Sequence, residues 1–166
     1  MHSMKKFSLL IAAAALLMLA GCGTKRSQAY YSAPSQVLSD NYDGTYVIRT
    51  QVRARNAAIA FTDGQRKAMT EVIFDGVRAG NNGVQDLKPL CLDLNGREKH
   101  EAYFQVFFKD KGEWTKYASL QDKRTTTTHY QRDGRQMVET VTVTIDRAGL
   151  KKKLQEDGII PAEGRY

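Results

Sequence analysis

Apolar and polar side chains alternate in two segments of the chain. In Gly44–Asn56, the side chains of Ile48, Val52 and Ala54 fall on the same side of an extended backbone. The alternation recurs through Gln136–Ile145, where valine and isoleucine take turns with threonine. Because side chains of a strand point to opposite faces in turn, this period of two is typical of half-buried strands. We therefore predict a strand in each segment.

A helical pattern follows the first strand. In Ala57–Val77, small and apolar residues recur every three or four positions, which predicts an amphipathic helix of about five turns. Its inner positions are Phe61, Gly64, Ala68, Met69, Val72, Ile73, Asp75 and Gly76. Asn56 is suited to cap the start of this helix and Gly76 to close its end in a left-handed conformation. Because so many inner residues are small, we expect the helix to lie very close to a sheet.

Three further elements are predicted between the helix and the last strand. Leu87–Leu94 is compatible with a short extended piece. In Glu98–Lys109 two pairs of aromatic residues stand four positions apart, which favours a helix, with a strand as the alternative. Glu113–Gln121 alternates as a strand, and Asp133–Gly134 is typical of a hairpin turn before the final strand.

The chain closes with a predicted helix that begins after Asp146. Leu150 and Leu154 form its apolar stripe, and Gly158 is suited to end it. The elements follow the order β-α-α-β-β-α. This order predicts an α+β two-layer domain, with a small, mostly antiparallel sheet and the helices on one face.

The start of the sequence has the pattern of a secretory signal. Lys5 and Lys6 precede Phe7–Leu19, which is apolar apart from one serine. A membrane-spanning helix needs about 20 apolar residues, and this run is shorter. A charged start, a short apolar middle and an exit of small residues indicate a secretory signal peptide.

The exit, Leu19-Ala20-Gly21-Cys22, resembles the lipobox of bacterial lipoproteins. The resemblance implies that Cys22 is lipidated, that residues 1–21 are removed, and that the lipid bilayer is a partner through Cys22. We then expect a location in the bacterial cell envelope, on the outer membrane facing the periplasm. The alternatives are an ordinary cleaved signal with a chance cysteine and an uncleaved anchor.

The remaining sequence divides into three predicted parts. Residues 22–43 read as the lipidated cysteine and a flexible tether, residues 44–160 as a single α+β domain, and residues 161–166 as a tail. The formal net charge is +7, and without the two lysines of the signal 23 basic and 18 acidic side chains remain. This excess is modest, and because the chain is exported we expect no nucleic acid partner.

The sequence offers few patterns of catalytic chemistry. It has no Cys-x-x-Cys or His-x-x-x-His spacing, no Gly-x-Ser-x-Gly turn and no phosphate-binding loop, and we predict no catalytic residue, metal or cofactor. His100 and His129 are the histidines that could serve an enzyme as a base. Cys91 lies among leucines, which favours a buried, inert thiol, and lipidation of Cys22 would leave it without a disulfide partner.

Two basic segments are candidates for ligand contact. The segment 123–132 interleaves basic, hydroxyl and aromatic side chains, a mixture that can grip acidic polymers or stack on sugar rings. Its candidate contacts are Lys123, Arg124, His129, Tyr130 and Arg132. The alternative is a solvated hairpin end. The run Lys151–Lys153 is interpreted as a solvated helix face, with an anion-binding site as the alternative.

The strand-and-helix segment VRARNAAIAFTDGQRKAMTEVIFDGV, residues 52–77, resembles a recurrent segment of small bacterial envelope lipoproteins of unknown function. More distantly it is similar to the N-terminal domain of the flagellar assembly protein T family. The aromatic segment YFQVFF, residues 103–108, is also similar to the lipoprotein group. The likeness spans roughly residues 44–158 and rests on structural motifs, so it implies no active-site residue.

These observations predict a membrane-anchored lipoprotein with a non-catalytic interaction or scaffold role in the cell envelope, and an envelope protein as its partner. A glycan or small-ligand binding module is the alternative, and it would use the basic hairpin. An envelope enzyme is the least favoured of the three.

Overall fold

The computed structural model describes residues 33–121, 126–130 and 137–162. The strands in this part of the chain are β1 (Gln36–Asp40), β2 (Thr45–Ala54), β3 (Arg78–Ala79), β4 (Ala118–Leu120), β5 (Thr126–Tyr130) and β6 (Met137–Asp146). The helices are α2 (Ala57–Phe74), α3 (Gly96–Lys99), α4 (Glu101–Phe107), α5 (Arg147–Glu156) and the short 3-10 helix η2 (Glu113–Lys116).

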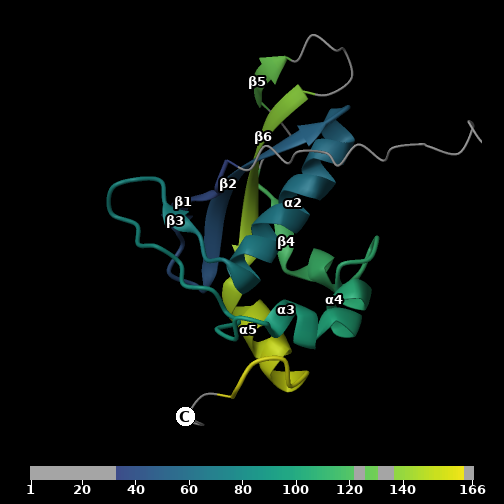
Figure 1. Ribbon diagram of the computed structural model, residues 1–166. Helices are drawn as coiled ribbons and strands as arrows, with labels where there is room; N and C mark the ends of the chain where they lie inside the picture. The colour runs from purple at the N-terminus through teal and green to yellow at the C-terminus, as the bar shows by residue number, and fades with distance from the viewer. Residues whose placement is uncertain (1–32, 122–125, 131–136, 163–166) are drawn as a thin grey trace, which may run out of the picture. The chain divides into compact units, whose positions relative to one another are not determined.

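The strands form one mixed sheet in the order β3-β1-β2-β6-β4, and β5 also pairs with β6. Only the contact between β1 and β3 is parallel among the described strands. Helix α2 lies across one face of the sheet, and α3, α4 and α5 gather toward one end of it (Figure 1). The predicted α+β class, with a mostly antiparallel sheet in a two-layer domain, is confirmed.

Strands β2 and β6 are the centre of the sheet, as the alternating sequence predicts. They pair over ten residues, from Thr45 opposite Asp146 to Ala54 opposite Met137. The alternation places Ile48 beside its partner Val143 on the side of the core, and both are fully buried. This pairing brings the start of β2 beside the end of β6, where α5 begins.

Helix α2 is close to the sheet because its inner face is small. The side chain of Asn56 caps the helix by accepting the Ile59 amide at 3.0 Å, and Gly76 follows its end with a φ of +77°. A Cβ atom added at Gly64 would lie 3.0 Å from Cβ of Val141 in β6. The predicted cap, closing glycine and close approach are therefore confirmed.

The prediction of a tether through residue 43 is wrong for Gln36–Asp40, which forms β1 in the sheet. This strand buries Val37 completely and pairs through its backbone with β2. Just before it, the ammonium group of Lys67 donates to the carbonyl oxygens of Ala33 at 2.6 Å and Gln51 at 3.0 Å. The chain is therefore attached to α2 and β2 from residue 33 onward.

Two other predicted strands differ from the structure. The segment Glu113–Gln121 is only partly extended, because it begins as η2 and continues as β4. This turn of 3-10 helix buries Trp114, whose ring nitrogen donates to the Lys109 carbonyl at 3.0 Å. Leu87–Leu94 contributes only an isolated bridge between Val77 and Leu87.

The later helices agree with the sequence pattern. The aromatic segment is helical in α4, and the side chains of Phe104 and Phe107 are buried. Helix α5 buries Leu150 and Leu154 completely. Cys91 is buried and unpaired among the described residues, so the prediction of a buried thiol is confirmed.

Candidate functional site

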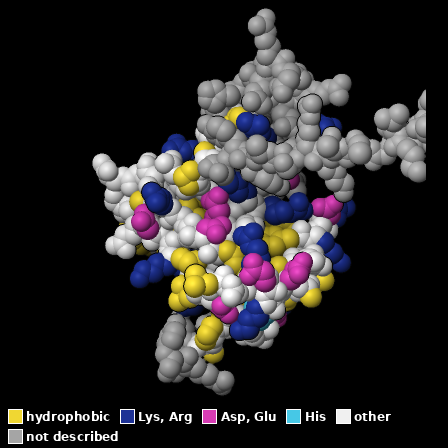
Figure 2. Space-filling view, viewed as in Figure 1, with side chains coloured by type: hydrophobic (Ala, Val, Ile, Leu, Met, Phe, Trp, Pro, Cys, Tyr) yellow, Lys and Arg dark blue, Asp and Glu magenta, His cyan; other side chains and the backbone are white. Residues whose placement is uncertain are grey.

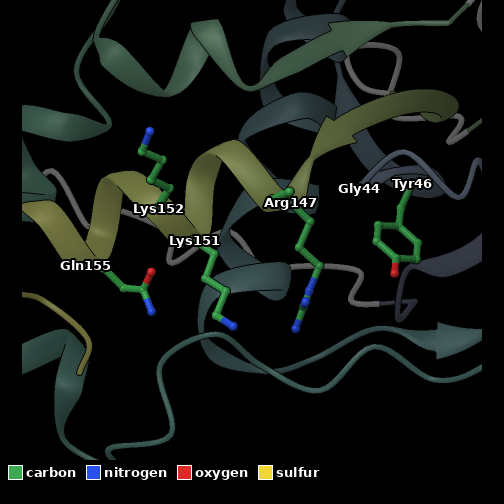
Figure 3. Close-up of a pocket in the computed structure, with 7 residues that line it drawn as sticks. Gly44, Tyr46, Arg147, Lys151, Lys152 and Gln155 are labelled. Carbon is green, nitrogen blue, oxygen red and sulfur yellow. The ribbon is translucent and has the colours of Figure 1, made fainter. Parts of the chain in front are cut away.

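A cavity of about 350 Å³ opens where the start of β2 meets helix α5. Figure 3 shows that the side chains of Arg147, Lys151 and Gln155 leave α5 on one side, while Lys152 points to the opposite side. Tyr46 of β2 extends its hydroxyl group on the side of Arg147. The lining residues are Gly44, Tyr46, Arg147, Ala148, Lys151, Lys152 and Gln155.

Local backbone geometry fixes this arrangement. The carboxylate of Asp146 caps α5 by accepting the Gly149 amide at 2.8 Å. The amides of Arg147 and Ala148 both donate to the carbonyl oxygen of Gly44, at 3.1 and 3.2 Å. Gly44 has a φ of +90°, a conformation that glycine adopts readily. The turn before β2 is therefore fastened to the first turn of α5.

The row of side chains at the cavity follows from helix periodicity. Arg147, Lys151 and Gln155 stand four residues apart, and residues at this spacing lie one above the other on a helix surface. The spacing of four can be read from the sequence. It is easily overlooked there, because Lys151 stands in a run of three lysines. Tyr46 lies far from these residues in sequence and joins them only through the pairing of β2 with β6.

Arg147 is a partly buried cation at the cavity. One of its Nη atoms donates to the Lys88 carbonyl at 2.9 Å, whereas Nε is buried without a hydrogen bond to the described residues. Burial lowers the pKa of the Arg147 guanidinium from its ordinary value, which leaves it charged at neutral pH. Burial also raises the pKa of Tyr46, the Asp40 carboxylate adds to this, and Arg147 opposes it. Tyr46 is therefore a neutral phenol at neutral pH.

The three lysines of α5 have different surroundings, so the interpretation of Lys151–Lys153 as one solvated face is wrong. Lys152 is exposed and lies 3.9 Å from Glu156. Lys153 pairs instead with Asp157 at 2.9 Å and Glu113 at 3.3 Å. Lys151 is partly buried and lies at the cavity.

The described residues include only some of the predicted site residues. The lipidation candidate Cys22 and the hairpin candidates Lys123, Arg124 and Arg132 lie outside them. The backbones of His129 and Tyr130 belong to β5, opposite Val138 and Met137 of β6. Residues 126–130 thus form a strand where the sequence analysis predicts none, and ligand contact there stays a prediction.

His100, the other candidate base, lies between α3 and α4 and is partly buried. It does not line the cavity at α5. Across the described residues, no three His, Cys, Asp or Glu side chains are grouped to hold a metal ion. None of the helices in this part of the chain has the length and apolar character needed to cross a membrane.

A second cavity, of about 500 Å³, lies beside the C-terminal end of α2. Two of its carboxylates are already used by the protein. Glu71 accepts the Ser35 amide at 3.1 Å and lies 3.7 Å from Lys67, and Asp86 accepts the Ala79 amide at 2.7 Å. These contacts fasten β1 and the loop after β3, so we assign this cavity a structural role.

Over the face shown in Figure 2, basic and acidic side chains are interspersed and no large area carries a single sign of charge. No protein-family model, curated protein or solved structure matches this chain.

Proposed function

We propose that this protein is a lipid-anchored bacterial lipoprotein that holds a non-catalytic interaction domain at the surface of an envelope membrane. The observation that carries the proposal is the tetrapeptide Leu19-Ala20-Gly21-Cys22, which follows a short apolar run and two lysines. A thioether-linked lipid at Cys22 would supply the membrane affinity. Two or more acyl chains are needed for stable anchoring, because a single chain binds only marginally.

The attachment of residue 33 limits how far the domain would stand from the membrane. Ala33 follows Cys22 by eleven positions, and Lys67 binds its carbonyl oxygen. A chain of this length spans at most roughly 40 Å when fully extended. The domain would therefore remain close to the headgroups.

An interaction role is supported by the side chains at the cavity between β2 and α5. Arg147, Lys151, Tyr46 and Gln155 offer positive charge and hydrogen bonds. They include no cysteine or serine beside a histidine or carboxylate base, which is the arrangement that activates a nucleophile. We infer that the domain binds another component of the envelope without transforming it.

The anchor is tested by replacing Cys22 with serine in cells that are fed a fatty-acid probe. We expect Cys22→Ser to lose the label and to accumulate as an uncut precursor, because the thiol that receives the lipid is gone. Gel fluorescence and the mass of the purified protein measure both effects.

Cys91→Ser is the matched control, since it makes the same substitution at the other cysteine of the chain. It should keep the label and the processed mass. Label retained by Cys22→Ser, or lost from Cys91→Ser alone, would contradict the assignment. Crosslinking in intact cells then identifies the protein that is bound at the envelope.

A further inference from the structure

We propose that the end of the domain where α5 begins rests on the lipid bilayer through two exposed turns, residues 41–44 and residues 92–95. The side chains that would enter the lipid are Tyr42, Leu92 and Leu94, which we call the apolar tips. The inference rests on the proposed lipid anchor, which would hold the domain beside a membrane, and it names the surface that meets the lipid.

The apolar tips are the most exposed large apolar side chains among the described residues. Leu94 is 99% exposed, Tyr42 89% and Leu92 68%. Val106 and Ile59 follow at 63% and 42%. Single exposed apolar residues are common on protein surfaces and need no explanation. Here, however, the three most exposed ones belong to two turns that the fold brings to the same end of the domain.

Both turns are fastened to the first turn of α5. The Gly44 carbonyl oxygen accepts the amides of Arg147 and Ala148 at 3.1 and 3.2 Å. The Lys88 carbonyl oxygen, four positions before Leu92, accepts a hydrogen bond from the Arg147 guanidinium at 2.9 Å. Arg147 therefore joins the turn between β1 and β2 to the loop that leads to α3. Figure 1 shows this turn and this loop at the end of the sheet where α5 begins.

Hydrogen bonds fix the backbone that presents each tip. The Tyr42 amide donates to the Asp40 carboxylate at 2.8 Å, and Tyr42 has a φ of +59°, which is uncommon for a side chain of this size. Leu92 follows Cys91, whose amide donates to the Ile73 carbonyl of α2 at 2.8 Å. Turns that are already ordered lose little conformational entropy when they contact lipid.

The acidic side chain between the two leucines is bound within its own loop. The Asp93 carboxylate accepts the Asn95 amide at 3.2 Å and lies 3.2 Å from the Lys99 ammonium group. These contacts keep its charge beside a cation while Leu92 and Leu94 stay exposed. Residues 86–99 carry as many basic as acidic side chains, namely Lys88, Arg97 and Lys99 against Asp86, Asp93 and Glu98. Apolar contact, and not attraction to anionic lipid, would therefore hold this loop on the membrane.

The chain before the domain is long enough for this end to reach the membrane that holds the anchor. Ala33 precedes Tyr42 by nine positions, a separation of at most roughly 32 Å. Cys22 precedes Ala33 by eleven positions, which reach roughly 40 Å when fully extended. A lipid on Cys22 and the apolar tips can therefore lie in one membrane.

A bilayer suits the apolar tips better than a protein partner does. Specific protein interfaces bury a broad complementary surface, typically about 800 Å² on each partner, whereas the tips are separate side chains on two narrow turns. A tyrosine ring with its hydroxyl group suits the level of the headgroups, and leucine suits the boundary of the acyl chains. A weak contact is sufficient, because the anchor would hold the domain at a high local concentration beside the lipid.

Tryptophan fluorescence in vesicles tests the docking. The full lipidated chain is reconstituted in phosphatidylcholine vesicles with or without bromine on the acyl chains, since bromine quenches a tryptophan that touches it. Leu94→Trp and Tyr42→Trp report from the two turns. Ile59→Trp is the matched control, because Ile59 is also exposed but lies in the first turn of α2, which follows the opposite end of β2. The native Trp114 is 2% exposed and contributes equally to all variants.

We expect brominated lipid to lower the added emission of Leu94→Trp and Tyr42→Trp about twofold or more, because both tips would lie at the boundary of the acyl chains. The emission of Ile59→Trp should stay nearly unchanged. Replacing both Leu92 and Leu94 with serine in the Tyr42→Trp protein should remove about half of its quenching or more, because the contact loses its apolar surface. Val106→Ser in the same background should leave the quenching unchanged, since Val106 is exposed on α4.

Unfolding curves establish that each variant is folded. Equal quenching at all three reporter positions, or no quenching at either turn, would overturn the docking. An equal effect of Val106→Ser and the double serine variant would also overturn it. Mass spectrometry of the reconstituted protein shows separately whether Cys22 carries lipid. Absence of that lipid contradicts the anchor, whereas a lipidated protein without quenching at the two turns contradicts only the docking.

Discussion

Helices α2 and α4 pack against the rest of the domain with side chains of opposite size. Helix α2 turns small residues to the sheet, and Gly64 comes so near Val141 that an added Cβ atom would lie 3.0 Å from it. Helix α4 instead fills the space with rings. Phe104 lies 4.8 Å from the ring centroid of Phe74 and 6.3 Å from that of Phe107, both edge to face.

The difference shows which change in side-chain volume each contact tolerates least. At α2 the backbone itself approaches the strands, so there is no room for added volume. At α4 the rings keep the backbone away, so a lost ring leaves a void that neighbouring elements cannot close. Enlarging a residue should damage the first contact, and truncating a residue should damage the second.

The largest effect should come from Phe104→Ala. Phe104 is 6% exposed and packs against four other rings, so its loss should leave a cavity and cost about 3–5 kcal/mol of unfolding free energy. Urea denaturation followed by circular dichroism measures this. Val106→Ala, on an exposed side of the same helix, should change stability by less than about 0.5 kcal/mol. A similar loss in both variants would mean that the helix itself, and not the ring cluster, determines the cost.

Ala68→Leu tests the contact at α2 in the opposite direction. Ala68 is fully buried on the sheet side of the helix, and the three extra carbon atoms should cost about 1–3 kcal/mol through overpacking. Ala102→Leu makes the same change at an exposed position of α4, where less than about 0.5 kcal/mol is expected. Urea denaturation compares the two. An Ala68→Leu protein as stable as the original would show that the helix can move away from the sheet without cost.

The elements that could be predicted have a recognisable pattern within their own sequence. Strands β2 and β6 alternate over ten residues each, and α2 has both a capping residue, Asn56, and a closing glycine, Gly76. By contrast, β1 buries one residue completely and is held mainly by backbone pairing, which leaves little trace in its side chains. The alternating sequence of Glu113–Gln121 predicts a strand over the whole segment. The segment instead forms one turn of 3-10 helix followed by a strand of three residues.

The candidate cavity could be predicted only in part, for a similar reason. The spacing of Arg147, Lys151 and Gln155 is local and indicates one helix face. The contribution of Tyr46 depends on the pairing of two strands that are distant in sequence. The three adjacent lysines take different directions, because successive residues of a helix are rotated around its axis. Glu156 and Asp157 stand four positions after Lys152 and Lys153, so the sequence indicates these two pairs. The contact of Lys153 with Glu113 joins distant segments and cannot be assigned from the sequence.

The smallest effect should come from the rim of the ring cluster, where Tyr103 stacks on Phe107 and donates its hydroxyl to Asp157 at 2.7 Å. Partial burial raises the pKa of Asp157, but hydrogen bonds from Tyr103 and Lys153 outweigh it, so its pKa lies below the ordinary 3.8.

A carboxyl group with a lowered folded pKa stabilises the fold above its unfolded pKa, and this contribution is lost as the pH falls through the folded value. Tyr103→Phe should therefore cost less than about 1 kcal/mol at pH 7, and less again as the pH falls through the lowered pKa of Asp157. Urea denaturation over a series of pH values from 7 downward measures the difference. Tyr117→Phe is the control, since no hydroxyl hydrogen bond of Tyr117 occurs within the described residues. A loss in Tyr103→Phe that stays the same throughout the acid series would assign the effect to ring packing and not to the hydrogen bond with Asp157.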